Sequence, residues 1–266
     1  MRIEQLGTGT PEIAIVGAIH GDEPCGVRAI ERLLAEAPPV DRPVALVVAN
    51  ERAFEANQRY IDHDLNRAFD PDIDTDSHEY GVAQTLAETL RGTTALALHS
   101  TQSYDAPFGF VKSMTDPAVT LMSQLSIEAL VDLSPLEEGR LFAVEADFIE
   151  VEAGRQGTEQ AAQQAYEIAR EFLAATGAID GQTADPNRTV PTFRIGDPIE
   201  KPPGDRYTVF AKNFRRVDVG EAFAAVDGTD LVADEPFYPI LLSAEGYDSI
   251  FGYRGVRIEP EPAATE

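Results

Sequence analysis

Short apolar runs alternate with segments of helical apolar spacing from residue 13 to residue 177. The runs at 13–19 and 44–49 are rich in Val, Ile and Ala, as expected for buried strands. Between them, Val27, Ile30 and Leu33 recur at the spacing of one helix face. This alternation predicts an α/β domain with a largely parallel sheet and helices on its faces.

The same two patterns continue along this part of the chain. Further strands are expected at 95–99, 108–111 and 148–151, and further helices around 82–90 and 165–172. After Gly177 the composition changes, and residues 180–205 are rich in Pro, Gly, Asp and Thr, which predicts a linker with turns. Short β-like runs follow at 207–211, 237–242 and 253–258. We therefore predict two domains, an α/β domain at 1–178 and a smaller β-rich domain at 179–266.

The charge of the chain excludes several classes of partner. There are 46 acidic and 21 basic side chains, which gives a formal net charge of -25. Such a surface repels phosphate backbones and anionic lipid, so we expect neither nucleic-acid nor membrane partners. The first residues lack the apolar core of a signal peptide, and the single cysteine, Cys25, permits no internal disulfide. Both features favour a cytoplasmic protein.

The acidic residues are scattered along the whole chain instead of being gathered in a tail. This distribution is typical of a folded surface adapted to high salt, although an acidic mesophilic protein would also show it. If the protein is halophilic, its melting temperature should rise from dilute buffer to molar salt, because screening relieves carboxylate repulsion. Thermal melts across that range check the prediction, and a constant melting temperature would contradict it.

The strongest local signal for chemistry is His20-Gly-Asp-Glu23, which follows a predicted strand and enters a predicted helix. Imidazole and carboxylate are zinc ligands, and a hydrolytic zinc site uses three protein ligands with one open position. Of the other histidines, only His99 ends an apolar strand, where sites in parallel sheets lie. His63 lies in a charged loop, and His78 is expected to be solvated. A His-x-x-Glu pair also occurs by chance, and strand-end histidines are often structural.

Four segments match motifs of one known family in the same order. The most specific is Arg-Tyr-Ile-Asp-His-Asp-Leu-Asn-Arg at 59–67. The others are Gly-Ala-Ile-His-Gly-Asp-Glu at 17–23, Leu-His at 98–99 and Val-Glu-Ala-Gly at 151–154. Together they resemble the succinylglutamate desuccinylase/aspartoacylase family of the zinc-carboxypeptidase-like group, closest to its aspartoacylase side. The resemblance extends from His20 to about Tyr247.

The resemblance implies a zinc-carboxypeptidase-like fold with a mixed, largely parallel sheet flanked by helices. It makes residues 1–178 the zinc-binding catalytic domain and gives the C-terminal domain the role of narrowing the active-site cleft. The implied roles are as follows: His20, Glu23 and His99 bind one zinc ion per chain, Glu152 is the catalytic glutamate, Arg59 polarises the scissile carbonyl, Asn66 and Arg67 grip the substrate's α-carboxylate, and Tyr247 binds substrate.

Two positions depart from the family pattern or compete for a role. Relatives often carry an aspartate two residues before the third ligand, where this chain has Ala97, so His99 needs another hydrogen-bond acceptor, such as a backbone carbonyl. Glu150 and Glu152 face the same side of one strand, and either could act as a base. The resemblance selects Glu152, and Glu150 is expected to be a solvated strand carboxylate.

The reaction implied by the resemblance is zinc-dependent hydrolysis of the amide bond of a small N-acyl amino acid, with release of the amino acid and a short carboxylate. The alternatives are a zinc carboxypeptidase acting on peptides and a non-catalytic metal-binding protein. An intact Glu152 argues against the latter, because a structural zinc site is closed by a fourth ligand and needs no base. The sequence does not determine the oligomeric state, and it is compatible with a homo-oligomer.

Overall fold

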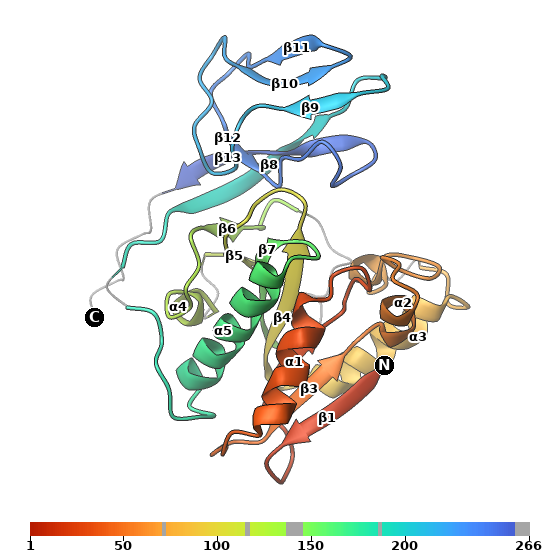
Figure 1. Cartoon of the computed structure of the whole chain (residues 1–266), viewed down its shortest axis with the longest axis vertical. Helices are drawn as coiled ribbons and strands as arrows, with labels where there is room; N and C mark the ends of the chain where they lie inside the picture. Colours follow the sequence, from red (N-terminus) through yellow and green to blue (C-terminus); the bar gives the residue numbers. More distant parts are fainter. Residues whose placement is uncertain (71–72, 115–117, 137–145, 186–187, 259–266) are drawn as a thin grey trace.

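The structure is a computed structural model that describes residues 1–70, 73–114, 118–136, 146–185 and 188–258 (Figure 1). Its helices are α1 Cys25–Glu36, α2 Glu51–Glu55, α3 His78–Leu90, α4 Ala118–Met122 and α5 Glu159–Ala175, with a 3-10 turn, η1, at Leu65–Arg67. Its strands are β1 Arg2–Leu6, β2 Ile13–Gly17, β3 Val44–Val48, β4 Thr94–Thr101, β5 Phe108–Val111, β6 Leu130–Asp132, β7 Asp147–Arg155, β8 Thr192–Glu200, β9 Tyr207–Val209, β10 Ala222–Val226, β11 Thr229–Val232, β12 Tyr238–Ile240 and β13 Ile250–Ile258.

Ten of the strands form one mixed sheet in the order β1-β3-β2-β4-β7-β5-β6-β8-β13-β12. Its centre is parallel, because β3, β2, β4 and β7 run in the same direction. Strand β5 is antiparallel to β7, and β8, β13 and β12 pair antiparallel at one edge. The predicted α/β architecture with a largely parallel sheet is therefore confirmed, together with its β-rich C-terminal part.

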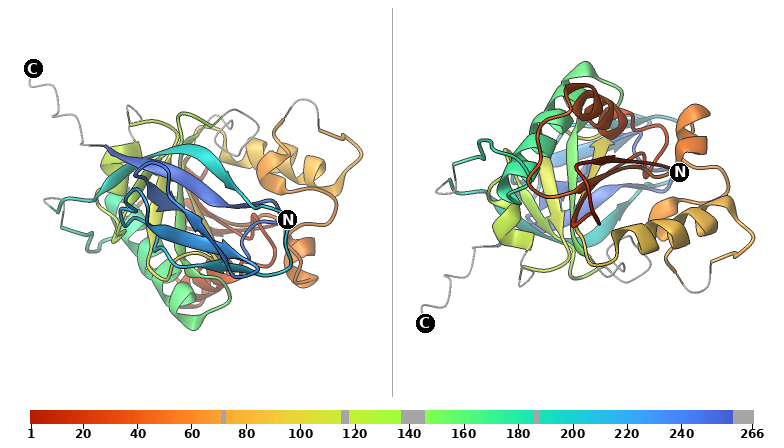
Figure 2. Two further views of the ribbon diagram at one scale, coloured as in Figure 1. Left: turned by 90° about the horizontal axis from the view of Figure 1, so that it is seen from above. Right: turned by 90° about the horizontal axis from the view of Figure 1, so that it is seen from below.

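Helices cover both faces of the parallel centre, as Figure 2 shows. On one face, α1 and α5 pack over alternate strand residues such as Ile13 and Ile15. On the other face, Ala14 and Val16 pack with α3. Strands buried on both faces read as continuous apolar runs, which is why these runs were visible in the sequence.

The C-terminal part of the chain contributes to two sheets. Strands β9, β10 and β11 form a separate three-stranded antiparallel sheet at the end of the molecule away from α1 and α5 (Figure 1). Strands β8, β12 and β13 instead extend the main sheet, and β8 pairs in parallel with β6. The main sheet thus crosses residue 178, and the domain boundary there stays a prediction.

One prediction for this region is wrong. Residues 192–200 lie in the segment expected to be a linker with turns, yet they form strand β8. Phe193, Ile195 and Ile199 are buried while residues between them are exposed, but Gly196 and Pro198 interrupt the pattern. The pairing of β8 with β13 shifts register there, and such irregularity makes a strand look like turns in sequence. Among the described residues, no helix is both long and apolar enough to cross a membrane.

Candidate metal and substrate site

The two histidines lie at the carboxyl ends of neighbouring parallel strands. His20 follows β2, His99 lies near the end of β4, and Val16 on β2 pairs with Ala97 on β4. Glu23 lies in the turn that leads into α1. The strand ends therefore bring together residues that are distant in sequence, as expected for a parallel sheet.

The turn that carries His20 and Glu23 is tightly packed. A Cβ atom on Gly21 would lie 2.2 Å from the backbone carbon of Ala53 and 2.4 Å from the backbone nitrogen of Phe54. The Gly21 N–H donates to the carbonyl of Arg59 at 3.0 Å. Only glycine allows this approach, so the turn that carries His20 and Glu23 is fixed against α2 and the following loop.

Three side chains converge on one point of this strand end. His20 Nδ1 lies 2.8 Å from Glu23 Oε1, and His99 Nδ1 lies 3.0 Å from Glu23 Oε2. One ligand atom from each residue lies within 4.8 Å of the others, and all three side chains are buried. The structure brings together the three predicted ligands, and His63 and His78 lie outside this group.

The charges in this group favour a cation. Burial opposes protonation of His20, but the carboxylates of Glu23 and Asp64 outweigh it and raise the pKa of His20 to about 9. Burial likewise opposes the charged form of Glu23, yet the two imidazoles hold its pKa well below the usual range. Positive charge is thus stabilised between these side chains. Two imidazoles and a carboxylate are also a donor set that zinc prefers, so the residues present fit a zinc ion.

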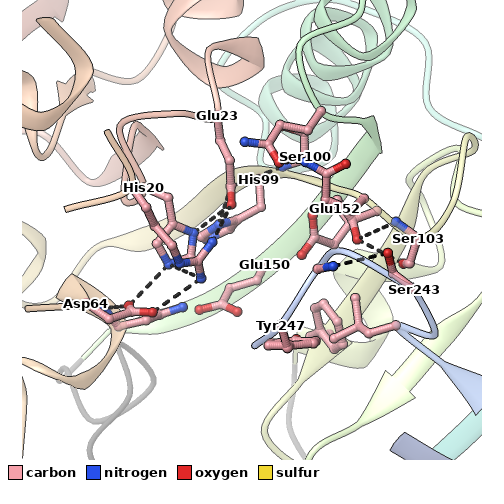
Figure 3. Close-up of a pocket in the computed structure, with 18 of the residues that line it drawn as sticks. His20, Glu23, Asp64, His99, Ser100, Ser103, Glu150, Glu152, Ser243 and Tyr247 are labelled. Carbon is pink, nitrogen blue, oxygen red and sulfur yellow. Dashed lines mark hydrogen bonds and ion pairs between the residues drawn. The ribbon is translucent and has the colours of Figure 1, made fainter. Parts of the chain in front are cut away.

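The loop at 59–67 lies against the His20 side of the group (Figure 3). Asp64 Oδ1 lies 3.2 Å from His20 Nε2, and Asp64 Oδ2 accepts a hydrogen bond from Arg59 at 3.2 Å. Arg59 also donates to Glu23 Oε1 at 3.3 Å. A carboxylate on the second nitrogen of a ligating histidine orients the ring, which is the function that Asp64 can serve for His20.

Asp64 was not assigned from the sequence, although it lies within the most specific motif. Its role depends on where the loop folds back, since His20 is 44 positions away. No described residue serves His99 as Asp64 serves His20. The Nε2 atom of His99 is buried and makes no hydrogen bond with any residue that the structure describes. Because Ala97 replaces the aspartate of relatives, we expected a backbone carbonyl to accept a hydrogen bond from His99. No such carbonyl is found among the described residues.

The two glutamates of β7 both lie at the cavity. Glu152 is level with His99 on the neighbouring strand, and its Oε2 atom is buried without a hydrogen-bond partner among the described residues. Burial, with the nearby charge of Glu23, raises the pKa of Glu152 to about 7. Glu150 is 5% exposed, so its expected solvated position is wrong. The sequence showed which face it occupies, but not that other elements cover that face.

All the residues predicted for the site line one cavity of about 380 Å³. They are His20, Glu23, Arg59, Asn66, Arg67, His99, Glu152 and Tyr247. Figure 3 labels five of them, His20, Glu23, His99, Glu152 and Tyr247. Asn66 is buried in η1, whereas Arg67 is exposed next to it. Leu241, Ser243 and Tyr253 add part of the wall from the C-terminal region. The structure thus gathers the predicted residues in one place, and their individual roles stay predictions.

The sequence matches one family over most of the α/β part. A family model described as the succinylglutamate desuccinylase/aspartoacylase catalytic domain matches residues 9–177. A probable aspartoacylase from Acaryochloris marina is 34% identical over 102 residues, which are 34% of this chain and 35% of that protein. An N-acyl-aromatic-L-amino acid amidohydrolase (carboxylate-forming) from Rattus norvegicus is 42% identical over 60 residues, 21% of this chain and 19% of that protein. The aligned parts therefore span about a third or less of these relatives.

Solved structures resemble nearly the whole chain in fold. A succinylglutamate desuccinylase/aspartoacylase from Rhodobacter sphaeroides superposes with a TM-score of 0.77 at 16% identity, covering 96% of this chain and 89% of that one. Murine aminoacylase 3 gives a TM-score of 0.72 at 19% identity, covering 95% and 97%. At such identities the likeness concerns the fold alone, and it includes the C-terminal region beyond residue 177.

Proposed function

Because the chain belongs to the succinylglutamate desuccinylase/aspartoacylase family, we propose that it is a zinc-dependent hydrolase that cleaves the amide bond of a small N-acyl amino acid. The observation that carries this proposal is the cavity shared by three sets of groups. These are the cation-binding group around Glu23, the half-buried side chain of Glu152, and the arginines of the loop at 59–67. Together they cover the needs of amide hydrolysis.

His20, Glu23 and His99 would hold the zinc ion. When bound, zinc supplies a Lewis acid that polarises the scissile carbonyl and makes water a stronger nucleophile near neutral pH. Three protein ligands leave a position open, as a hydrolytic site requires. Asp64 keeps the imidazole of His20 in place through its Nε2 atom.

Glu152 is the proposed proton carrier. Its carboxylate takes a proton from the attacking water and passes it to the nitrogen of the leaving amine. Burial raises the pKa of Glu152 above the usual carboxyl range, which makes its carboxylate a stronger base toward the attacking water. The oxygen Oε2, buried and without a partner among the described residues, is available for the transfer.

Arg59 and the pair Asn66–Arg67 are the proposed substrate contacts. The guanidinium of Arg59 lies beside Glu23 and can stabilise the negative charge that develops on the carbonyl oxygen. Arg67 has a planar fork of donors that matches a carboxylate, and Asn66 can add an amide donor. Tyr247, from the C-terminal region, lines the same cavity and is a further proposed substrate contact. That region forms part of the cavity wall, which supports a small substrate over a peptide.

A panel of N-acyl amino acids and peptides, scored for amine release with and without a chelator, tests the proposal. We expect cleavage of N-acyl amino acids, loss of activity with chelator, and recovery when zinc is restored. Cleavage of peptides in preference to N-acyl amino acids would favour the carboxypeptidase alternative. No cleavage of either, with zinc bound, would favour a non-catalytic protein.

The ligand assignment gives a separate prediction. The purified protein should carry one zinc per chain, and replacing His20, Glu23 or His99 by alanine should empty the site, because two remaining donors bind zinc weakly. Metal analysis of each variant checks this. The matched control is His63→Ala, which removes an exposed histidine of the adjacent loop and should leave zinc bound. A fully loaded His99→Ala variant would remove His99 from the ligand set.

A further inference from the structure

Glu79 is a buried carboxylate that faces away from its own helix. It is the second residue of α3 and has no exposed surface. The start of α3 is already capped by Ser77, whose side chain accepts a hydrogen bond from the Tyr80 N–H at 3.3 Å. The carboxylate of Glu79 is therefore not needed to cap this helix.

The hydrogen bonds of Glu79 go instead to the loop at 59–67. Oε1 accepts the Ile61 N–H at 2.7 Å, and Oε2 accepts the N–H groups of Asp62 and His63 at 3.0 and 3.2 Å. The Asn50 side chain adds a fourth donor at 2.8 Å. One buried carboxylate thus holds three consecutive backbone N–H groups of this loop. The backbone of the loop makes few other hydrogen bonds.

These three amides lie between the two functional parts of the loop. Arg59 precedes them by two positions, and Asp64, Asn66 and Arg67 follow them. Fixing the middle of the loop sets the direction of both flanks, since the backbone has few free dihedrals between them. Asp62 adds a return contact, because its carboxylate accepts the His78 N–H at 2.8 Å. The loop and the start of α3 are therefore held together from both sides.

We infer that Glu79 is a positioning residue that aims Arg59 and the Asn66–Arg67 pair into the cavity. The inference builds on the proposed function, which gives those side chains their roles. Burial opposes the ionised form of Glu79, but the hydrogen bonds it accepts from Ile61, Asn50, Asp62 and His63 lower its pKa, so it acts as an anion. A carboxylate that receives several N–H groups is a strong anchor, because each bond is charge-assisted.

The test replaces Glu79 by glutamine, which keeps the shape but turns one acceptor oxygen into a donor that faces N–H groups. We expect kcat/KM for N-acyl amino acids to fall by on the order of 10²-fold, as for small displacements of groups that orient a substrate. The kinetics are measured at saturating zinc, because Asp64, which orients His20, lies in the same loop and its displacement should weaken zinc binding. The preference for a free acid over its methyl ester should fall as well, which a loss of stability alone would not cause. Glu79→Asp keeps the charge on a shorter side chain, and its kcat/KM should lie between those of the wild type and Glu79→Gln.

Glu171→Gln is the matched control. Glu171 is also a helix glutamate that accepts a backbone N–H from a distant loop, that of Ser126 at 2.6 Å, but neither residue lines the cavity. This variant should keep the wild-type kcat/KM and acid preference. Equal losses in the Glu79 and Glu171 variants would show a general effect on stability and overturn the inference.

Hydrogen exchange separates this inference from the proposed function. In Glu79→Gln the amides of 61–66 should exchange faster than in the wild type, while those of β4 keep their protection. Unchanged exchange at 61–66 would overturn the inference even if the enzyme is active. A wild-type protein that cleaves no N-acyl amino acid would reject the proposed function, and the exchange of 61–66 would still decide whether Glu79 holds the loop.

Discussion

Replacing Glu152 by glutamine should lower kcat by roughly 10²–10⁴-fold, the range for removal of a general acid-base group. The amide cannot accept the proton of the attacking water, and it cannot deliver one to the leaving amine. Zinc content should not change, because Glu152 is not among the proposed ligands. Steady-state kinetics together with metal analysis of the purified variant check both halves of this prediction.

Glu150→Gln is the control for this experiment. Glu150 lies two positions earlier on β7, faces the same side and lines the same cavity. It is level with Ala97, whereas Glu152 is level with the proposed ligand His99. Its replacement should therefore reduce kcat much less. A larger loss in Glu150→Gln than in Glu152→Gln would reverse the assignment of the base.

N-acyl amino acids should be cleaved far better than their methyl esters or amides. Arg67 can bind a free α-carboxylate through two parallel hydrogen bonds, and an ester offers neither the charge nor the second acceptor. Because Arg67 is exposed, the difference should be about 1.5–3 kcal/mol in transition-state binding, the range for hydrogen bonds to charged groups. Comparison of kcat/KM for matched acid and ester substrates measures it.

Variants of Arg67 show whether this side chain reads the carboxylate. Arg67→Ala should shrink the difference between acid and ester, and Arg67→Lys should restore little of it, because an ammonium lacks the planar fork. Arg28→Ala is the control, since Arg28 is paired with Glu159 outside the cavity. Equal turnover of acid and ester by the wild-type protein would show that no carboxylate clamp operates, and another small amide would then be the better candidate.

The parts of the site that were predictable from sequence are those fixed by local pattern. His20 and His99 end apolar runs, and parallel strands bring such ends together whatever the rest of the chain does. The position of Glu23 follows from the turn into α1 in the same way. The family motif then supplied Arg59, Asn66 and Arg67, which lie in a loop and in the short η1 turn, where no apolar periodicity predicts their placement.

The parts that were missed depend on contacts between distant segments. The burial of Glu150 and the hydrogen bonds of Glu79 are set by elements packed over them, and nothing in the neighbouring residues signals either. Asp64 is one aspartate among several in its loop, and only the fold shows that it reaches His20. Strand β8 was missed because Gly196 and Pro198 obscure its alternation, while its pairing with β6 and β13 defines it.

The passage of the main sheet across residue 178 bears on how such proteins can be recombined. In a chimera that carries the whole C-terminal region of a relative, β6 would come from one parent and β8 from the other. These two strands would have to pair with each other, and their side chains occur together in neither parent. Leu241 and Tyr253 of the cavity wall belong to this exchanged part. Substrate preference and sheet integrity would therefore be inherited together. Grafts limited to the three-stranded sheet of β9, β10 and β11 leave the pairing of β6 with β8 intact, and should therefore disturb the main sheet less.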